Sequence, residues 1–199
     1  MDRVHDEDTP DHPASDAARS RGTITLVRID PAGADREELI AFMTGEVFPF
    51  HVGTRPTREQ VEDGIADGRY RDDDNDSFWI DHVEHGRIGF FRLEEISDGA
   101  PLFDLRLASP WRGRGLAKEV VKTAADHVFT TMPEVDRFEG QTREDNRAMR
   151  RVFEACGWVQ EAYYREGWPV EGAEPLGSVA YSILRRDWET GEVTPLRWS

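Results

Sequence analysis

The sequence predicts a single domain of the mixed α/β class, with a mixed sheet of about seven strands flanked by about four helices. Short runs of β-forming residues alternate with longer runs in which apolar residues recur every three or four positions. A succession of strand, helix and strand from residue 102 to residue 141 is typical of a crossover between two parallel neighbouring strands in a buried sheet. The length of 199 residues suits one domain with a real core.

Residues 1–22 are expected to be a flexible tail, and the domain would span residues 23–199. The tail has almost no bulky apolar side chains and many Asp, Pro, Ser and Ala residues, so it buries too little surface to offset the entropy of ordering. Its two histidines, His5 and His12, are expected to be solvated side chains and not metal ligands.

The domain should begin with a strand over residues 23–29, where apolar residues stand among β-formers. Two helices should follow, because residues 35–38 (Asp-x-x-Glu) and 57–60 (Thr-x-x-Gln) have the pattern of a capping box before an apolar run. Residues 77–83 and 87–93 then predict two strands joined by a hairpin turn.

Three aspartates before this hairpin, Asp72, Asp74 and Asp76, alternate like the first ligands of a calcium loop. The sixth position of such a loop needs glycine and holds Ser77, and the twelfth needs glutamate and holds Val83. We therefore expect a solvated acidic loop and no metal site.

The second half of the domain should contain four more strands and two more helices. The patterns predict strands over residues 102–108, 137–141, 159–164 and 179–184, and helices over residues 112–130 and 146–156. The first two of these strands and the helix between them make up the crossover unit.

Composition and charge exclude several function classes. Lys and Arg number 25 against 40 Asp and Glu, and the net charge of −15 argues against a protein that binds nucleic acid by neutralising phosphates. The single cysteine, Cys156, excludes an internal disulfide and a multi-thiolate zinc site. No apolar run approaches the roughly 20 residues of a membrane span, and the N-terminal segment lacks the apolar region of a signal peptide. A cytoplasmic location without membrane contact is therefore expected.

Residues 105–117 run from a strand through a tight turn into a helix, and they are typical of an anion site. Gly113 and Gly115 lack Cβ atoms where backbone must approach a ligand, and the following helix N-terminus offers unpaired N–H groups. Charge agrees, because residues 104–122 carry five cations and two anions within an acidic chain. The stretch matches neither the loop of nucleoside triphosphatases nor that of dinucleotide-binding proteins. A phosphate or pyrophosphate is the expected ligand.

These residues resemble the GNAT superfamily of acetyl-CoA-dependent N-acetyltransferases. Residues 112–117 match the family signature Gln/Arg-x-x-Gly-x-Gly/Ala, and residues 146–158 look like its Asn-x-x-Ser/Ala...Glu-Lys-x-Gly-Phe segment. Residues 181–188 resemble the end of the subgroup that acetylates the N-termini of ribosomal proteins. The resemblance implies acetyl-CoA as the cofactor, with its pyrophosphate on the backbone of residues 112–117 and its pantetheine arm facing Asn146. The cofactor site implied in this way comprises Leu107, Ala108, Arg112, Gly113, Arg114, Gly115, Leu116, Ala117 and Asn146.

The resemblance also implies direct attack of a neutral amine on the thioester, with a base that takes the ammonium proton. Asp104 stands where many relatives carry a glutamate and is the first candidate for this base. Glu161 and Glu166, which flank two tyrosines, are the second choices.

The positions of the family's usual proton donors hold Phe153 instead of a tyrosine and Met149 instead of a serine. The donor would then be Tyr163 or Tyr164, a water molecule, or no group at all. Asp104, Tyr164 and Glu166 are thus the candidate catalytic residues, whereas Cys156, at a helix end, is expected to be a small core side chain and not a nucleophile.

We expect an enzyme that acetylates the primary amine of a protein N-terminus or of a small molecule. The alternatives are a catalytically degenerate acyl-CoA-binding protein and a non-enzymatic interaction domain. By resemblance, aromatic side chains would wall the acceptor site, and the acidic excess favours a cationic acceptor. The family fold is also compatible with a homodimer. The expected walls are Phe48, Phe50, His51 and Trp168.

Overall fold

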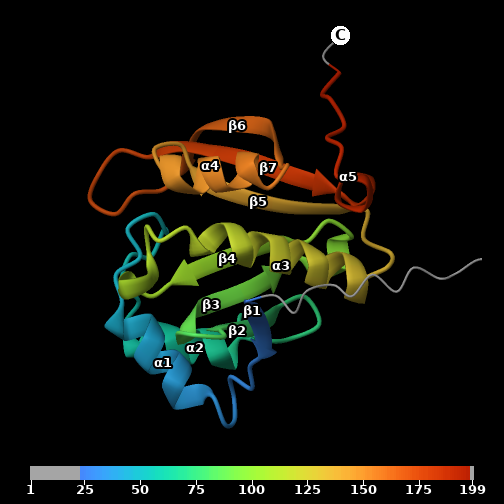
Figure 1. The fold of residues 1–199 in the computed structure, drawn as a ribbon. Coiled ribbons are helices and arrows are strands. Elements are labelled where there is room, and N and C mark those ends of the chain that lie inside the picture. The colour runs from blue at the N-terminus through green and yellow to red at the C-terminus, as the bar shows by residue number, and fades with distance from the viewer. Residues whose placement is uncertain (1–22, 198–199) are drawn as a thin grey trace, which may run out of the picture.

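Residues 23–197, which the computed structural model describes, form two antiparallel sheets with five α-helices around them (Figure 1). The first sheet has the strand order β1-β2-β3-β4 and comprises β1 (Ile24–Arg28), β2 (Asp76–His82), β3 (Gly86–Glu94) and β4 (Leu102–Leu107). The second has the order β5-β7-β6 and comprises β5 (Arg137–Arg143), β7 (Leu176–Leu184) and β6 (Val159–Trp168). The mixed α/β class and the seven strands are confirmed, but the strands divide between two sheets.

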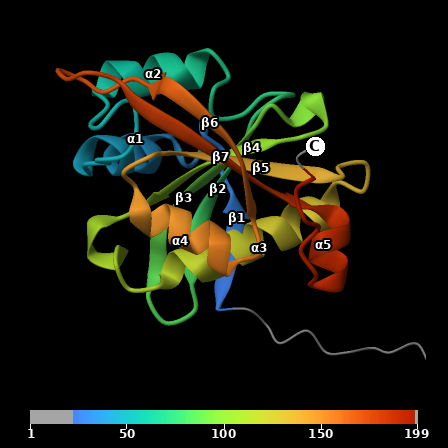
Figure 2. The same cartoon turned by 90° about the horizontal axis from the view of Figure 1, so that it is seen from above.

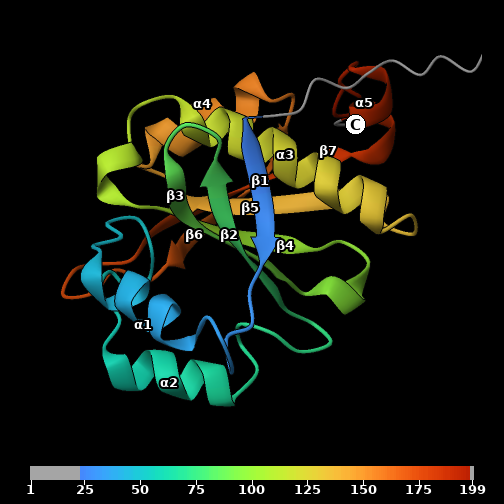
Figure 3. The ribbon, with the colours of Figure 1, turned by 60° about the horizontal axis from the view of Figure 1, so that its bottom comes forward.

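The helices cover both faces of the first sheet (Figure 3). Side chains alternate along a strand, so Trp79 and Phe90 pack with one group of helices while the neighbouring Phe78 and Phe91 pack with another. The first group is α1 (Arg36–Gly45) and α2 (Arg58–Ala66), and the second includes α3 (Leu116–Thr131). Figure 2 shows α4 (Arg147–Ala155) beside α3, while α5 (Arg185–Thr190), which the sequence pattern did not predict, directly follows β7.

The two predicted capping boxes have different outcomes. At α2, Thr57 Oγ1 accepts from the Gln60 backbone N–H at 3.2 Å, and Gln60 Oε1 accepts from the Thr57 N–H at 2.8 Å, so this box is confirmed. At α1 the box is wrong, because the Asp35 carboxylate accepts from the Asp30 N–H at 2.8 Å and from Trp79 Nε1 at 3.0 Å. Asp35 therefore ties the start of α1 to β2.

The two strands of the predicted crossover unit, β4 and β5, belong to different sheets, so their pairing in one sheet is wrong. A backbone hydrogen bond of 2.9 Å from Glu139 to the Pro101 carbonyl joins them just before β4. Beyond this bond the Phe103 ring packs between the sheets, with its centroid 5.3 Å from that of Phe138 and 5.7 Å from that of Trp158. Aromatic side chains thus fill part of the space that opens between the strands.

Within residues 23–197, no helix is long and apolar enough to cross a membrane. The same residues contain no group of three or more His, Cys, Asp or Glu that could hold a metal ion. In the acidic loop, Asp72 accepts backbone hydrogen bonds from Asp74 and Asn75 at 2.8 and 2.7 Å. The expected tail with its two histidines lies outside the described residues.

Candidate active site

The glycine loop, residues 112–115, lies between β4 and α3 and is open on its outer side. Gly113 and Gly115 have φ angles of +69° and +85°, and a Cβ at either position would have no heavy atom within 4 Å. Among the described residues, none accepts a hydrogen bond from the backbone N–H groups of residues 113–115. These donors precede the positive end of α3, which is an arrangement suited to binding an anion.

The side chain of Arg112 supports this loop from inside the protein. Its Nε donates to the Leu107 carbonyl at 2.7 Å and its Nη1 to the Val47 carbonyl at 2.6 Å. Its Nη2 contacts Glu46, whose carboxylate also accepts from the Ser109 N–H at 3.0 Å. The loop therefore presents backbone donors to a ligand, while the guanidinium of Arg112 fixes their position.

Two adjoining cavities lie beside β4. The smaller, of about 210 Å³, is beside the glycine loop and is mainly apolar; we call it the slot. The larger, of about 440 Å³, extends along β4 and is called the main cavity. Because they share walls, one ligand in the slot and another in the main cavity could touch. The shared residues are Phe50, His51, Leu105, Arg106, Asn146 and Met149.

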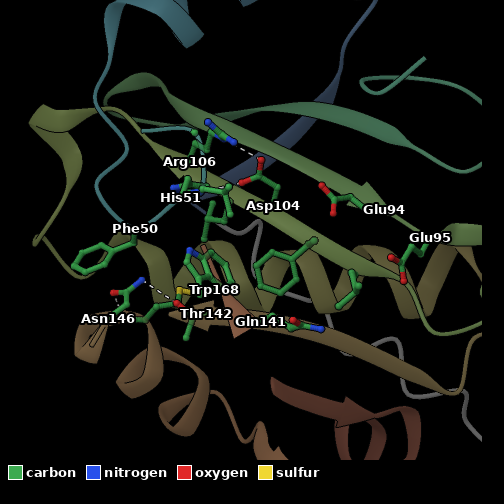
Figure 4. A pocket seen from close by; sticks show the side chains of 16 residues that line it. Phe50, His51, Glu94, Glu95, Asp104, Arg106, Gln141, Thr142, Asn146 and Trp168 are labelled. Atoms are coloured by element: carbon green, nitrogen blue, oxygen red, sulfur yellow. Dashed lines mark hydrogen bonds and ion pairs between the residues drawn. The ribbon is translucent and has the colours of Figure 1, made fainter. Parts of the chain in front are cut away.

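Asp104 lies at the centre of a charged network in the main cavity (Figure 4). Its Oδ1 is 3.0 Å from His51 Nε2, and its Oδ2 accepts from Arg106 Nε at 2.9 Å, with Arg92 Nη2 at 3.9 Å. Burial alone would raise the pKa of the Asp104 carboxyl, but the charge of Arg106 and the interaction with His51 outweigh it and hold the pKa well below its usual range. Asp104 is therefore a largely buried carboxylate whose surroundings favour its ionised form.

Two further carboxylates, Glu94 and Glu95, line the main cavity beyond Asp104 (Figure 4). Burial raises the pKa of Glu94, and the nearby Arg92 opposes this shift. Glu95 has a φ of 56°, in the left-handed region that non-glycine residues rarely adopt. Sequence reasoning missed both residues, although an acidic pair directly after a predicted strand was the available signal.

Aromatic and polar side chains from the second sheet and the loop after α1 complete the main cavity. Phe50, His51 and Trp168, three of the four expected acceptor-site walls, line this cavity, whereas Phe48 is buried in the core and lines the slot. Trp168 Nε1 is buried, and no hydrogen-bond acceptor among the described residues contacts it. Asn146 caps α4 by accepting from the Met149 N–H at 3.2 Å.

The structure brings together part of the predicted cofactor site. Gly115 belongs to the open loop, whereas Ala108 donates its N–H to Ile88 and Leu116 is buried in the core. The exposed Arg114 lies over the Trp111 ring, 5.2 Å from its centroid, outside both cavities. The predicted cofactor residues that line a cavity are Leu107, Arg112, Gly113, Ala117 and Asn146.

Of the three candidate catalytic residues, Asp104 lines the main cavity, and Tyr164 and Glu166 line neither cavity. The Tyr164 side chain is exposed on β6, and Glu166 is exposed with a φ of 54°. The other candidates are also engaged elsewhere, since Glu161 binds Arg137 and the Tyr163 hydroxyl donates to Glu144 at 2.7 Å.

Met149 and Phe153 hold the positions of the family's usual proton donors, and of the two only Met149 lines the cavities. Phe153 is fully buried and stacks on Tyr181, with ring centroids 4.8 Å apart. Cys156 lines neither cavity, and burial raises the pKa of its thiol. The thiol is therefore poorly suited to nucleophilic attack.

Comparisons with known proteins agree with this architecture. The family model described as "Acetyltransferase (GNAT) domain" matches residues 23–159, and the comparison with curated proteins finds no match. The solved spermidine N-acetyltransferase from Vibrio cholerae in complex with CoA and spermine has a TM-score of 0.69 at 17% identity, covering 84% of this chain and 99% of that chain. A chimera of that enzyme and hSSAT has a TM-score of 0.70 at 17% identity, covering 85% and 99%.

At this identity the solved structures show the fold alone. Membership of the subgroup that acetylates ribosomal proteins stays a prediction, and nothing in the comparisons supports a catalytically degenerate acyl-CoA-binding protein. The family match covers most of the described residues, and the enzymes of this family use acetyl-CoA as acetyl donor. This chain therefore belongs to the GNAT acetyltransferase family and is an acetyl-CoA-dependent N-acetyltransferase.

Proposed function

We propose that this enzyme acetylates a primary amine of a small polycationic acceptor, by direct attack of the amine on the thioester. The observation that carries the proposal is the carboxylate pair Glu94 and Glu95 in the main cavity, which adjoins the slot beside the glycine loop. A molecule with two cationic groups could place one beside the slot and the other against this pair, where opposite charges attract.

The slot and the glycine loop have the features that acetyl-CoA needs. The N–H groups of residues 113–115 would bind its pyrophosphate, and the apolar slot between Leu107 and Met149 would hold its pantetheine arm. Asn146 lies on the wall shared by the two cavities, where it would face that arm. When bound, acetyl-CoA supplies the carbonyl carbon that the amine attacks and the thiolate that leaves.

The charges along the main cavity favour a cation over a neutral acceptor. Asp104 is ionised, and Arg106 and Arg92 partly neutralise it. Glu95, by contrast, has no ion pair among the described residues, so its charge is available to an acceptor. The solved relative that binds CoA and spermine supports a polycationic acceptor for this fold.

A panel of amines with the purified enzyme tests this function. We expect kcat/KM for diamines and polyamines to exceed that for monoamines of equal length by about tenfold, which corresponds to about 1.4 kcal/mol from one additional charge interaction. The panel also includes peptides with free N-termini, because the predicted subgroup acts on protein N-termini. Release of the CoA thiol measures the rate.

The variant Glu95→Gln should remove most of the preference for polyamines and leave kcat/KM for monoamines within about twofold. Glu134→Gln is the matched control, because it makes the same change at an exposed position in the loop between α3 and β5. Equal kcat/KM for monoamines and polyamines, or a preference for the peptides, would contradict the proposed acceptor class.

A further inference from the structure

We propose that His51 is the group that takes the proton from the acceptor's ammonium, and that Asp104 is the positioning residue that orients the neutral imidazole and stabilises the imidazolium that forms. The proposal rests on the proposed function, since it requires an amine acceptor in the main cavity. It also changes the role predicted for Asp104, from the base itself to the partner of the base.

The hydrogen bond between the two side chains fixes the tautomer of His51. An ionised carboxylate can only accept hydrogen bonds, so His51 Nε2, at 3.0 Å from Asp104 Oδ1, must carry the proton. In the neutral imidazole, Nδ1 then carries the free lone pair. The Phe48 ring packs edge-on against the imidazole, with centroids 5.6 Å apart, and limits its rotation.

Within residues 23–197, the Nδ1 atom of His51 has no hydrogen-bond partner. It is buried, and no donor among the described residues forms a hydrogen bond to it. A buried acceptor left without a partner costs about 1–3 kcal/mol, so such an atom is often reserved for a ligand. The imidazole lines both the slot and the main cavity, which is where an amine and a thioester would meet.

Two other residues of the main cavity also have a buried polar atom without a hydrogen-bond partner among the described residues. Arg106 Nη1 and Trp168 Nε1 are buried without a hydrogen bond among residues 23–197, and both residues line the main cavity with His51. A ligand with donor and acceptor groups would satisfy all three. This concentration of unsatisfied atoms distinguishes the main cavity from a surface hollow.

The neighbouring carboxylates are less suited to take the proton. Asp104 is held ionised by Arg106 and His51, so a proton transferred to it would be far less stable than one on imidazole. Glu94 is bound to Arg92. The charged groups around His51 are Asp104 and Arg106 from β4, Arg92 and Glu94 from β3, and Arg143 from β5, which lies over Phe50.

The proton balance of the reaction is complete with His51 as the base. The acceptor ammonium gives one proton to Nδ1, and the resulting imidazolium is paired with Asp104. The amine nitrogen then forms a bond to the carbonyl carbon while the carbon–sulfur bond breaks. The second proton leaves the nitrogen for the departing thiolate, and His51 releases its proton to solvent.

Nuclear magnetic resonance of the enzyme without ligands tests the arrangement independently of activity. Imidazole ¹⁵N shifts of the neutral side chain, assigned by the variant His51→Gln, should show the Nε2–H tautomer that the contact with Asp104 requires. An Nδ1–H tautomer overturns the proposal.

Kinetics tests the chemical role. His51→Gln should lower kcat/KM by about 10²- to 10⁴-fold and abolish the acidic limb of the pH–rate profile. The acetyl-CoA Kd, measured by calorimetry, reports separately any loss of contacts in the slot, which His51 also lines. Asp104→Asn should move the acidic limb to lower pH, which a purely structural role would not do. The control His127→Gln changes a histidine on α3 that lines neither cavity and should leave the profile unchanged.

The outcomes separate this proposal from the proposed function. Acetylation of amines by the wild-type enzyme with an unchanged acidic limb in His51→Gln overturns the role of His51 alone. Binding of acetyl-CoA without acetylation of any amine overturns the proposed function and the base role with it. If His51→Gln does not fold, as judged by circular dichroism, the Asp104→Asn profile decides: a shifted limb supports the proposal, and an unshifted limb overturns it.

Discussion

Replacing Gly140 with alanine should destabilise the protein, because this glycine of β5 lies against two aromatic rings at the junction of the sheets. A Cβ there would be 2.7 Å from Phe103 Cε1, 2.7 Å from Phe153 Cζ and 2.8 Å from Phe153 Cε1. Carbon atoms in contact are normally about 3.5–4.0 Å apart, so the rings would have to move by about 1 Å.

The rings have little freedom to move. Phe153 is fully buried, stacks on Tyr181 and packs against Trp158 with ring centroids 5.0 Å apart. Overpacking of this kind costs about 1–3 kcal/mol. The reduced entropy of the unfolded chain returns about 0.4–1 kcal/mol. We therefore expect Gly140→Ala to lower the free energy of unfolding by about 1–2 kcal/mol, which is about 2–8 °C in Tm.

Gly45→Ala makes the same chemical change but should change the free energy of unfolding in the opposite direction. Gly45 ends α1, and a Cβ there would meet nothing within 4 Å. This variant should raise the free energy of unfolding by about 0.4–1 kcal/mol. Urea unfolding followed by tryptophan fluorescence measures both changes. Equal free energies of unfolding for Gly140→Ala and wild type would refute the reasoning, because the rings of Phe103 and Phe153 would then accommodate the added methyl group without loss of stability.

Three further predictions follow from single contacts. Gly115→Ala should lower the free energy of unfolding in urea by about 1–2 kcal/mol, because alanine disfavours a φ of +85°. Calorimetry should also show weaker acetyl-CoA binding by this variant. Unchanged values for both would contradict the role of the glycine loop. Hydrogen bonds from the Asp30 N–H and from Trp79 lower the pKa of Asp35, so its stabilisation is present above a pH of about 4 and is lost as pH falls towards the folded pKa. Asp35→Asn should therefore flatten the pH dependence of urea unfolding below about pH 4, whereas the exposed Asp136→Asn should not. Cys156→Ala should keep kcat within about twofold. The half-buried wild-type thiol, whose pKa is raised, should react more slowly with iodoacetamide at pH 8 than a free cysteine. A large loss of kcat in Cys156→Ala would indicate a catalytic thiol.

The capping boxes illustrate which local predictions hold. Thr57 and Gln60 satisfy each other across three residues, so their sequence spacing was sufficient. Asp35 has the same spacing to Glu38, but the indole of Trp79, 44 positions away, competes for its carboxylate. A contact with a residue so distant in the sequence cannot be predicted from a local pattern.

The candidate site also has one part that the sequence predicted and one part that it did not. The glycine loop was predictable, because positive φ angles and a following helix are properties of a few consecutive residues. The network around Asp104 was not, because His51 reaches it from a loop 53 positions earlier in the chain. From the sequence, His51 was predicted to be an aromatic wall, and its pairing with a buried carboxylate emerged from the packing of that loop on β4.

Apart from the resemblance to the family, which its motifs carried, the sequence by itself determined the class of domain, the order of the seven strands and first four helices, and the glycine loop. These features depend on residue periodicity and on interactions between near neighbours, which the order of residues states directly. The tertiary structure decided that β4 and β5 separate and that the Glu94–Glu95 pair lines the same cavity as Asp104. It also decided which ionisable groups meet, because contacts between distant segments depend on how the whole chain packs, and those contacts set the charge and the proton affinity of the site.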